Sequence, residues 1–160
     1  MSSHDPDSVR RAVARHSLPE VAQAIAQGGA VDALDREGRT PLFYAAMAGE
    51  LEIIAELIRH GANVNAQDKR LETPLHFAAR EYQPQVAELL LKSGANVDTK
   101  DAHGNSPLWR AIFDSKGRGQ VIKLLLSSGA NKNLKNVHGV SPEELAKSIG
   151  NYEISPFLVE

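Results

Sequence analysis

Apolar residues recur along this chain at helical spacing. Two segments show the pattern most clearly, and their apolar positions are Ile53, Ile54, Leu57 and Ile58 in one and Val86, Leu89, Leu90 and Leu91 in the other. Because residues three and four apart share a face of a helix, each segment predicts a helix with one apolar face. A Gly-Ala pair follows each segment, at Gly61 and Gly94. Glycine in this place is typical of a helix end.

The helix starts are marked by a hydroxyl residue followed by proline. The hydroxyl can cap free backbone amides, and proline at the first helical position sacrifices no hydrogen bond. Such pairs recur at intervals of 33, 33 and 35 residues, at Thr40-Pro41, Thr73-Pro74, Ser106-Pro107 and Ser141-Pro142. The Gly-Ala-Asn phrases that begin at Gly61, Gly94 and Gly129 show the same change in spacing, from 33 to 35 residues. The chain therefore repeats one unit, with a two-residue insertion in the segment 114–119.

A turn phrase precedes the helix starts at a constant offset. It begins with Asp or Asn and ends with Gly, as in Asp35 to Gly38, Asp101 to Gly104 and Asn136 to Gly139. These residue types favour tight turns. Each unit is thus predicted to contain a turn, a short helix, a loop and a second helix. One such helix pair cannot bury its apolar faces alone, so neighbouring units must stack.

The 33-residue period and the stretch Thr73-Pro74-Leu75-His76-Phe77-Ala78-Ala79 resemble the ankyrin repeat family. The resemblance implies an all-α fold, an ankyrin-repeat solenoid of stacked helix-turn-helix units with protruding β-turn loops. A single domain is then expected over residues 1–160. It divides into an N-terminal cap (7–34), three full repeats (35–67, 68–100 and 101–135) and a C-terminal cap (136–160).

The composition of the chain excludes or disfavours several classes of function. The 160 residues include no cysteine, which excludes disulfides, cysteine-ligated metal sites and cysteine catalysis. The 18 Lys and Arg against 20 Asp and Glu give a net charge of −2, which argues against nucleic-acid binding driven by overall charge. The polar N-terminus predicts no targeting segment, and no apolar stretch approaches the ~20 residues that span a bilayer. A cytoplasmic protein without membrane contact is expected.

No catalytic or cofactor motif occurs in the sequence. It contains no dinucleotide-binding or phosphate-binding glycine pattern, no His-Glu-x-x-His and no Gly-x-Ser-x-Gly. We therefore expect no catalytic residue, no cofactor and no metal. For His76, the resemblance implies a structural hydrogen bond to a neighbouring loop. His103 and His138 occupy equivalent turns, but no third ligand accompanies them.

Basic residues gather on two neighbouring turns. Arg36, Arg39, Lys69 and Arg70 lie there, interleaved with acidic residues. Mixed charges suit a protein partner with patterned charges better than a phosphate backbone. Leu71 stands where the other turns have glycine, and its role as a contact or as part of a remodelled turn is open. Contact and packing roles are equally open for Tyr82, which replaces the glycine found at Gly49 in the preceding unit.

Six of the eight aromatic rings fall in or just after the first helices of the three full repeats. The resemblance places these helices on a concave groove. Phe43 and Trp109 are expected to pack between units, whereas Tyr44 and Phe77 suit either core or contact roles. Side-chain types enriched at interfaces complete the prediction. The predicted partner-binding residues are Arg36, Arg39, Tyr44, Met47, Lys69, Arg70, Leu71, Phe77, Arg80, Tyr82, His103, Arg110 and Phe113.

The sequence favours a non-catalytic module that binds a folded protein through its concave face and is monomeric when unbound. The residues from Ser141 to Tyr152 and the pair Phe157-Leu158 resemble the ends of small stand-alone bacterial ankyrin proteins, many of which are immunity proteins. Neutralisation of a toxin or enzyme is therefore the most specific hypothesis. The alternative is a scaffold or regulatory adaptor that masks a kinase or transcription factor. An enzyme or a nucleic-acid binder is less favoured.

Overall fold

The computed structural model describes residues 5–149 and 155–158. Within these ranges the chain forms ten helices and no strand. They are α1 (Ser8–Ala14), α2 (Leu18–Ala26), α3 (Pro41–Ala48), α4 (Leu51–Arg59), α5 (Pro74–Arg80), α6 (Pro84–Lys92), α7 (Pro107–Phe113), α8 (Gln120–Ser127), α9 (Pro142–Ser148) and α10 (Ser155–Leu158). The all-α fold predicted from the repeats is confirmed.

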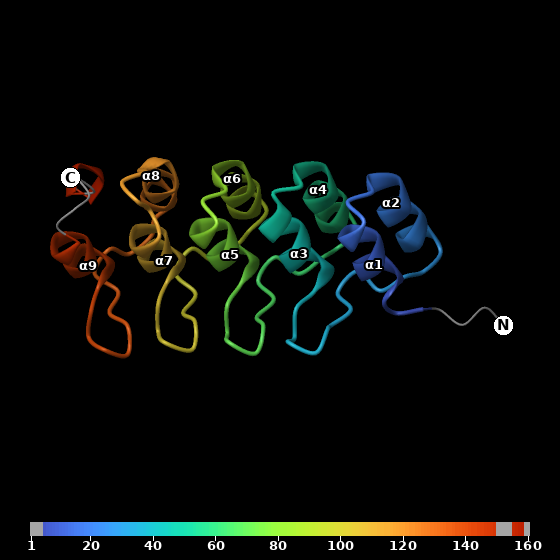
Figure 1. Ribbon diagram of the computed structural model, residues 1–160, viewed down its shortest axis with the longest axis horizontal. Coiled ribbons are helices and arrows are strands. Elements are labelled where there is room, and N and C mark those ends of the chain that lie inside the picture. Colours follow the sequence, from blue (N-terminus) through green and yellow to red (C-terminus); the bar gives the residue numbers. More distant parts are fainter. Residues whose placement is uncertain (1–4, 150–154, 159–160) are drawn as a thin grey trace.

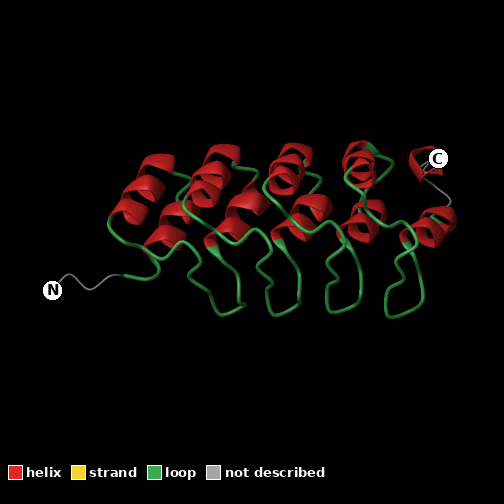
Figure 2. Ribbon diagram, turned by 180° about the vertical axis from the view of Figure 1, so that it is seen from behind, coloured by secondary structure: helices red, strands yellow, loops and turns green. Residues whose placement is uncertain are grey.

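The helices form two parallel rows (Figure 1). Helices α1, α3, α5, α7 and α9 make one row, and α2, α4, α6, α8 and α10 make the other. Each helix contacts its pair partner and its neighbours in the same row, as α5 does with α6, α3 and α7. Long loops extend from the first row on one side of the molecule (Figure 2). Because contacts run between neighbours, the molecule is a solenoid.

Hydroxyl side chains cap most of the helices that start with proline. Thr73, Ser106 and Ser141 accept hydrogen bonds from the amides three residues on, at 3.4, 3.3 and 3.2 Å. Thr40 precedes α3 without making this bond, and its buried Oγ1 has no hydrogen-bond partner among the described residues. The predicted cap is therefore wrong at Thr40, where the hydroxyl makes no bond to the helix amides and proline alone marks the start.

The loops between helix pairs are built on an Asp or Asn side chain. Its Oδ1 accepts hydrogen bonds from the backbone N–H groups two and four residues later, at 2.8 to 3.0 Å, from Asp35, Asp68, Asp101 and Asn136. Backbone bonds then join each loop to the next. Three amides donate across, Lys69 to Glu37 at 2.9 Å, Ala102 to Arg70 at 2.8 Å and Val137 to His103 at 3.0 Å. The loop tips thus form one continuous edge.

A second polar row links the units beyond the ends of the outer helices. The Asn63 amide donates to the Asp32 carboxylate, the Asn96 amide to the Asn65 side chain, and the Asn131 amide to the Asp98 carboxylate. The shortest bond of each link is 2.8 to 3.1 Å. Neighbouring units are therefore tied together at both edges, which fixes their spacing.

The core between the two rows is made mainly of small and aliphatic side chains. Leu42, Leu75 and Leu108 recur at one position of the inner helices and are fully buried. Alanines one turn later are also buried, which lets the helices approach closely, at Ala45, Ala78 and Ala111. Phe43 and Phe77 meet edge to face, with ring centroids 5.5 Å apart. Burial of this apolar surface is the main force that holds the stack together.

Across the part of the chain that the structure describes, four non-glycine residues adopt left-handed backbone conformations, and two of them, Leu71 and Tyr82, stand in full repeats at positions that glycine occupies in other units. Leu71 has φ of +58°, where Gly38 has +76° and Gly104 has +73°. Tyr82 has φ of +56°, where Gly49 has +76°. The turn geometry is therefore kept in spite of the substitutions, and each costs about 1 kcal/mol or more in backbone strain.

Replacement of Leu71 by glycine is expected to stabilise the protein. The side chain is 47% exposed, so its loss removes little packing, while the backbone strain of about 1 kcal/mol is relieved. Urea unfolding of the wild type, Leu71→Gly and the control Leu71→Ala measures the effect. Alanine removes the same exposed side chain but keeps a Cβ. Equal stabilities of the two variants would contradict the strain explanation.

Candidate functional site

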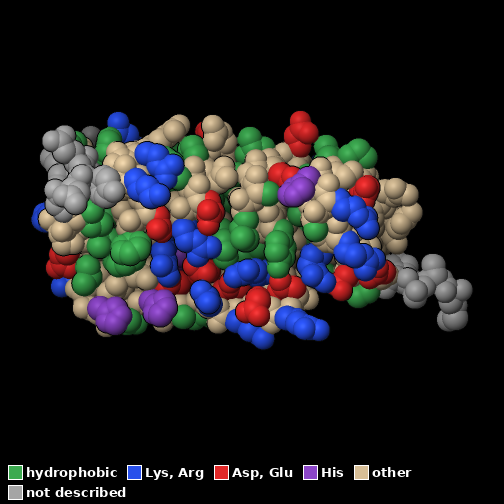
Figure 3. All heavy atoms as spheres, viewed as in Figure 1, with side chains coloured by type: hydrophobic (Ala, Val, Ile, Leu, Met, Phe, Trp, Pro, Cys, Tyr) green, Lys and Arg blue, Asp and Glu red, His purple; other side chains and the backbone are tan. Residues whose placement is uncertain are grey.

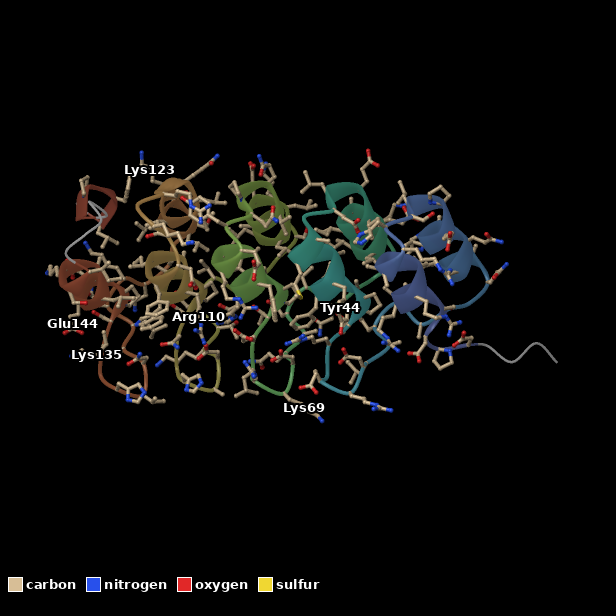
Figure 4. All side chains as sticks on the ribbon, viewed as in Figure 1. Tyr44, Lys69, Arg110, Lys123, Lys135 and Glu144 are labelled. Atoms are coloured by element: carbon tan, nitrogen blue, oxygen red, sulfur yellow. The ribbon has the colours of Figure 1, made fainter. Side chains whose placement is uncertain are left out.

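The predicted contact residues lie mostly on one face, formed by helices α3, α5 and α7 and by the loops 35–39, 68–72 and 101–105. We call this surface the inner face. Figure 3 shows Lys, Arg, Asp and Glu side chains gathered where these loops meet the helices, with apolar side chains beside them. Figure 4 places Tyr44 and Arg110 at this junction and Lys69 at the end of its loop, away from the helices. We call the part of the inner face where the loops meet the helices the floor, and the row of loop tips the edge.

The edge is formed by the loop tips, which carry exposed side chains. Arg36, Lys69, Arg70 and His103 are all exposed, and Leu71 lies beside Arg70. The tips are held in place by their backbone hydrogen bonds, because Asp35, Asp68 and Asp101 organise the turns beneath them. The five predicted contact residues of the loop tips are therefore accessible to a partner.

The floor contains three nearly inaccessible carboxylates, and four ion pairs join them to arginines; the longest joins Arg110 Nη2 to Glu72 Oε1 at 4.0 Å. The side chains of Asp68 and Asp101 are 1% exposed and that of Glu72 is 3% exposed. Arginines reach them from the inner face, with Arg39 Nε 3.3 Å from Asp68 Oδ2, Arg80 Nη1 3.0 Å from Glu72 Oε1 and Arg110 Nη2 2.6 Å from Asp101 Oδ2. Three of the predicted contact arginines therefore have a structural role.

Hydrogen bonds favour the ionised form of Asp35 and Asp101, two of the three carboxylates that begin turns. Burial alone would raise the pKa of Asp101, but donors from the Asn105 amide, the Arg110 guanidinium and the His103 amide outweigh it and lower that pKa. The pKa of Asp35 is lowered in the same way, against burial, chiefly by the hydroxyl of Tyr44. Tyr44 is half-buried, and burial together with this bond raises the pKa of its hydroxyl.

Phe77 is fully buried, and the prediction that it contacts a partner is wrong. Its ring and that of Phe43 pack edge to face, and two guanidinium groups cover the Phe77 ring. Those of Arg39 and Arg80 lie 5.1 and 4.4 Å from the ring centroid. The arginines that pair with the buried carboxylates thus seal the aromatic core from solvent.

Phe113 is the most exposed aromatic side chain of the inner face, with 56% of its surface accessible. It ends helix α7 and stacks on half-buried Trp109, with centroids 5.3 Å apart and an interplanar angle of 15°. Met47, at the corresponding position of α3, is half-buried. The two rings form an apolar platform at one end of the inner face.

Tyr82 packs against the inserted segment 114–119. Its hydroxyl accepts a hydrogen bond from the Val121 amide at 3.4 Å, and the guanidinium of Arg118 lies 4.1 Å from its ring centroid. Ser115, in the same segment, is buried. Tyr82 therefore has a packing role that joins consecutive units.

His76 has the structural hydrogen bond that the resemblance implied. Its Nδ1 accepts from the Thr73 amide at 3.1 Å, so Nε2 carries the proton and donates to the Asn105 carbonyl at 3.0 Å. Burial lowers the pKa of His76, which is consistent with a neutral ring. Among the described residues, no group of three or more His, Asp or Glu side chains is arranged to hold a metal ion.

Comparison with known proteins gives one family. The sequence model of the ankyrin repeats (3 copies) matches residues 10–101 and 71–136. The two matches together extend over most of the 160 residues. The chain belongs to the ankyrin repeat family. No curated protein matches it significantly. Ankyrin repeats are generally protein-binding modules and are typically non-catalytic.

The predicted site residues of this ankyrin-repeat protein do not include the buried carboxylates of Asp68, Glu72 and Asp101. Asp68 and Asp101 begin the turn phrase, so a signal for their position was present, but their arginine partners come from a neighbouring unit or a helix nine residues away. Trp109, which was expected to pack between units, packs against the core while half-buried and also stacks on Phe113. Of the helices in the described part of the chain, none is long and apolar enough to cross a membrane.

Asp101→Asn is expected to weaken the fold and flatten its response to acid. Asn136 holds its own turn through Oδ1, so asparagine can keep the backbone bonds while the charge opposite Arg110 is lost. We expect a cost of about 1 to 3 kcal/mol at neutral pH. Because the folded-state pKa of Asp101 is lowered, its contribution exists above the unfolded pKa and disappears as the pH falls through the folded value.

Urea unfolding at about pH 7 and about pH 3 tests this contribution. The wild type should lose more stability than Asp101→Asn on acidification, so the two unfolding free energies converge. A constant difference between the two proteins at both pH values would show that the charge of Asp101 contributes nothing.

Proposed function

We propose that this ankyrin-repeat protein binds a folded protein through a concave face formed by the loop tips and the inner helices, and that binding neutralises the partner. The exposed Phe113 ring carries the proposal. It projects from a helix that is otherwise well packed, and it is held rigidly by Trp109. Aromatic side chains supported in this way are typical anchors of interfaces.

The proposed action is inhibition by occupation of the partner's surface. In support, exposed apolar and charged side chains lie together on the inner face, and backbone hydrogen bonds join its loops, so little entropy should be lost on binding. The likeness of the C-terminal residues to small bacterial ankyrin proteins favours an immunity-type role. We further propose that the unbound protein is a monomeric cytoplasmic domain with the repeat boundaries given above. In this proposal its partner is a protein, and it binds no nucleic acid, membrane or cofactor.

A photo-crosslinking amino acid at Ala102 is expected to capture the partner in cells of the native host. Ala102 is exposed at a loop tip, and its replacement leaves all charges of the inner face intact. The control is the same amino acid at Ala55, an exposed alanine of outer helix α4. A protein adduct from position 102 and none from position 55 is the expected result. Equal adducts from both positions, or none from 102, would refute the proposed face.

Phe113→Ala is expected to weaken binding of the captured partner about tenfold, because it removes the anchor of the apolar platform. Since the ring is largely exposed, the unfolding free energy should change by less than about 1 kcal/mol. Titration calorimetry with purified partner measures the affinity. Leu51→Ala, which truncates a side chain that is 39% exposed at the start of α4, is the matched control and should bind normally. An unchanged affinity of Phe113→Ala would exclude the platform.

The partner's own activity distinguishes neutralisation from scaffolding. An immunity-type protein should abolish a toxic or enzymatic activity of the partner at equal molar ratio, and co-expression should protect cells from it. A partner that keeps full activity in the complex would refute neutralisation and support the scaffold alternative. Both results leave the binding face as proposed.

A further inference from the structure

The loop tips carry an excess of exposed positive charge. Arg36, Lys69 and Arg70 are exposed on two consecutive tips, and we call these three residues the basic edge. Glu37 is the exposed acidic residue beside them. None of the three cations forms an ion pair with a carboxylate of the described residues, whereas the arginines of the floor do. The edge therefore has a local charge of about +2 on a chain whose net charge is −2.

The basic edge is held at fixed geometry by the backbone. The Lys69 amide donates to the Glu37 carbonyl at 2.9 Å, and the Arg70 carbonyl accepts from the Ala102 amide at 2.8 Å. The side chains themselves take no part in these bonds. Their charges are thus placed by the fold yet remain available for a partner.

The floor beneath the edge adds no positive charge. Arg39, Arg80 and Arg110 pair with the buried carboxylates of Asp68, Glu72 and Asp101. Half-buried Asp35, whose carboxylate accepts a hydrogen bond from the Tyr44 hydroxyl, makes the floor slightly acidic. Other cations near the loops are occupied, since Lys100 donates to the Lys135 carbonyl and Lys135 pairs with Glu144 at 3.5 Å. An anionic ligand would therefore lie along the tips, not on the floor.

We propose that the basic edge binds an acidic segment of the protein partner. This inference rests on the proposed function and adds the partner's chemistry to it. The short row of three cations, with Glu37 among them and Leu71 next to Arg70, fits an acidic peptide segment better than a nucleic acid. A phosphate backbone would require a longer uninterrupted row of cations.

A labelled polyglutamate peptide tests the edge without the native partner. Fluorescence anisotropy at low salt compares it with polylysine of equal length and with a random DNA duplex. Overall charge would favour polylysine on a chain of net charge −2, whereas the basic edge favours polyglutamate. We expect polyglutamate to bind most tightly. Stronger binding of polylysine or an equal affinity for DNA would overturn the proposal.

The double variant Lys69→Gln/Arg70→Gln should weaken polyglutamate binding about fivefold, because two exposed contacts are lost. The matched control Lys92→Gln/Lys147→Gln removes the same charge from exposed side chains of α6 and α9 and should bind as the wild type does. Equal weakening in both variants would show that overall charge governs binding and would refute the edge.

The crosslinking experiment separates the two proposals. Adducts from Ala102 that survive nuclease treatment and contain a segment rich in Asp and Glu support the acidic partner. Adducts that contain no acidic segment, or that are unaffected by Lys69→Gln/Arg70→Gln, overturn this inference while the protein-binding face stands. Loss of all adducts at position 102 would overturn the face itself.

Discussion

The side chain that begins each loop holds together both the fold and the inner face. Its Oδ1 binds two backbone amides and so shapes the turn, while its second polar atom faces the floor. In Asp68 and Asp101 that atom binds an arginine, and in Asp35 it binds a tyrosine hydroxyl. In Asn136 it is an amide that donates to Asn105 at 2.9 Å. One residue thus fixes the loop tip and the neighbouring floor together.

The sequence was sufficient to predict the elements, because the repeat period places proline at helix starts and glycine at helix ends. It was insufficient for the floor, because the charge partner of an arginine depends on the stacking of the neighbouring unit. Arg36 and Arg39 look alike in sequence, yet one is exposed and the other reaches Asp68 in the next loop. The same stacking buries Phe77 under Arg39 and Arg80, which local periodicity does not reveal.

The insertion in the fourth helix pair shows how an unfavourable backbone conformation is balanced by tertiary contacts. Tyr82 takes a left-handed conformation that costs about 1 kcal/mol or more. Its side chain in return binds the Val121 amide and carries Arg118 over its ring, and both partners follow or belong to the inserted segment. Leu71 has the same type of backbone strain, but its side chain is exposed. The strain at Leu71 is therefore not offset by packing of its side chain.

In the proposed function, the floor serves stability and the edge serves recognition. A change to Arg110 removes the ion pair of the buried Asp101 carboxylate, and a change to Arg80 leaves buried Glu72 with only its 4.0 Å pair to Arg110. Loss of a partner from a buried carboxylate is costly, so these positions are constrained by folding. A change to Arg36, Lys69 or Arg70 removes an exposed charge that has no ion-pair partner within residues 5–149 and 155–158, so it should have little effect on stability. The edge can therefore alter its charge pattern without disturbing the stack. Because its backbone is fixed by hydrogen bonds between loops, each new pattern would be presented to a partner in the same geometry.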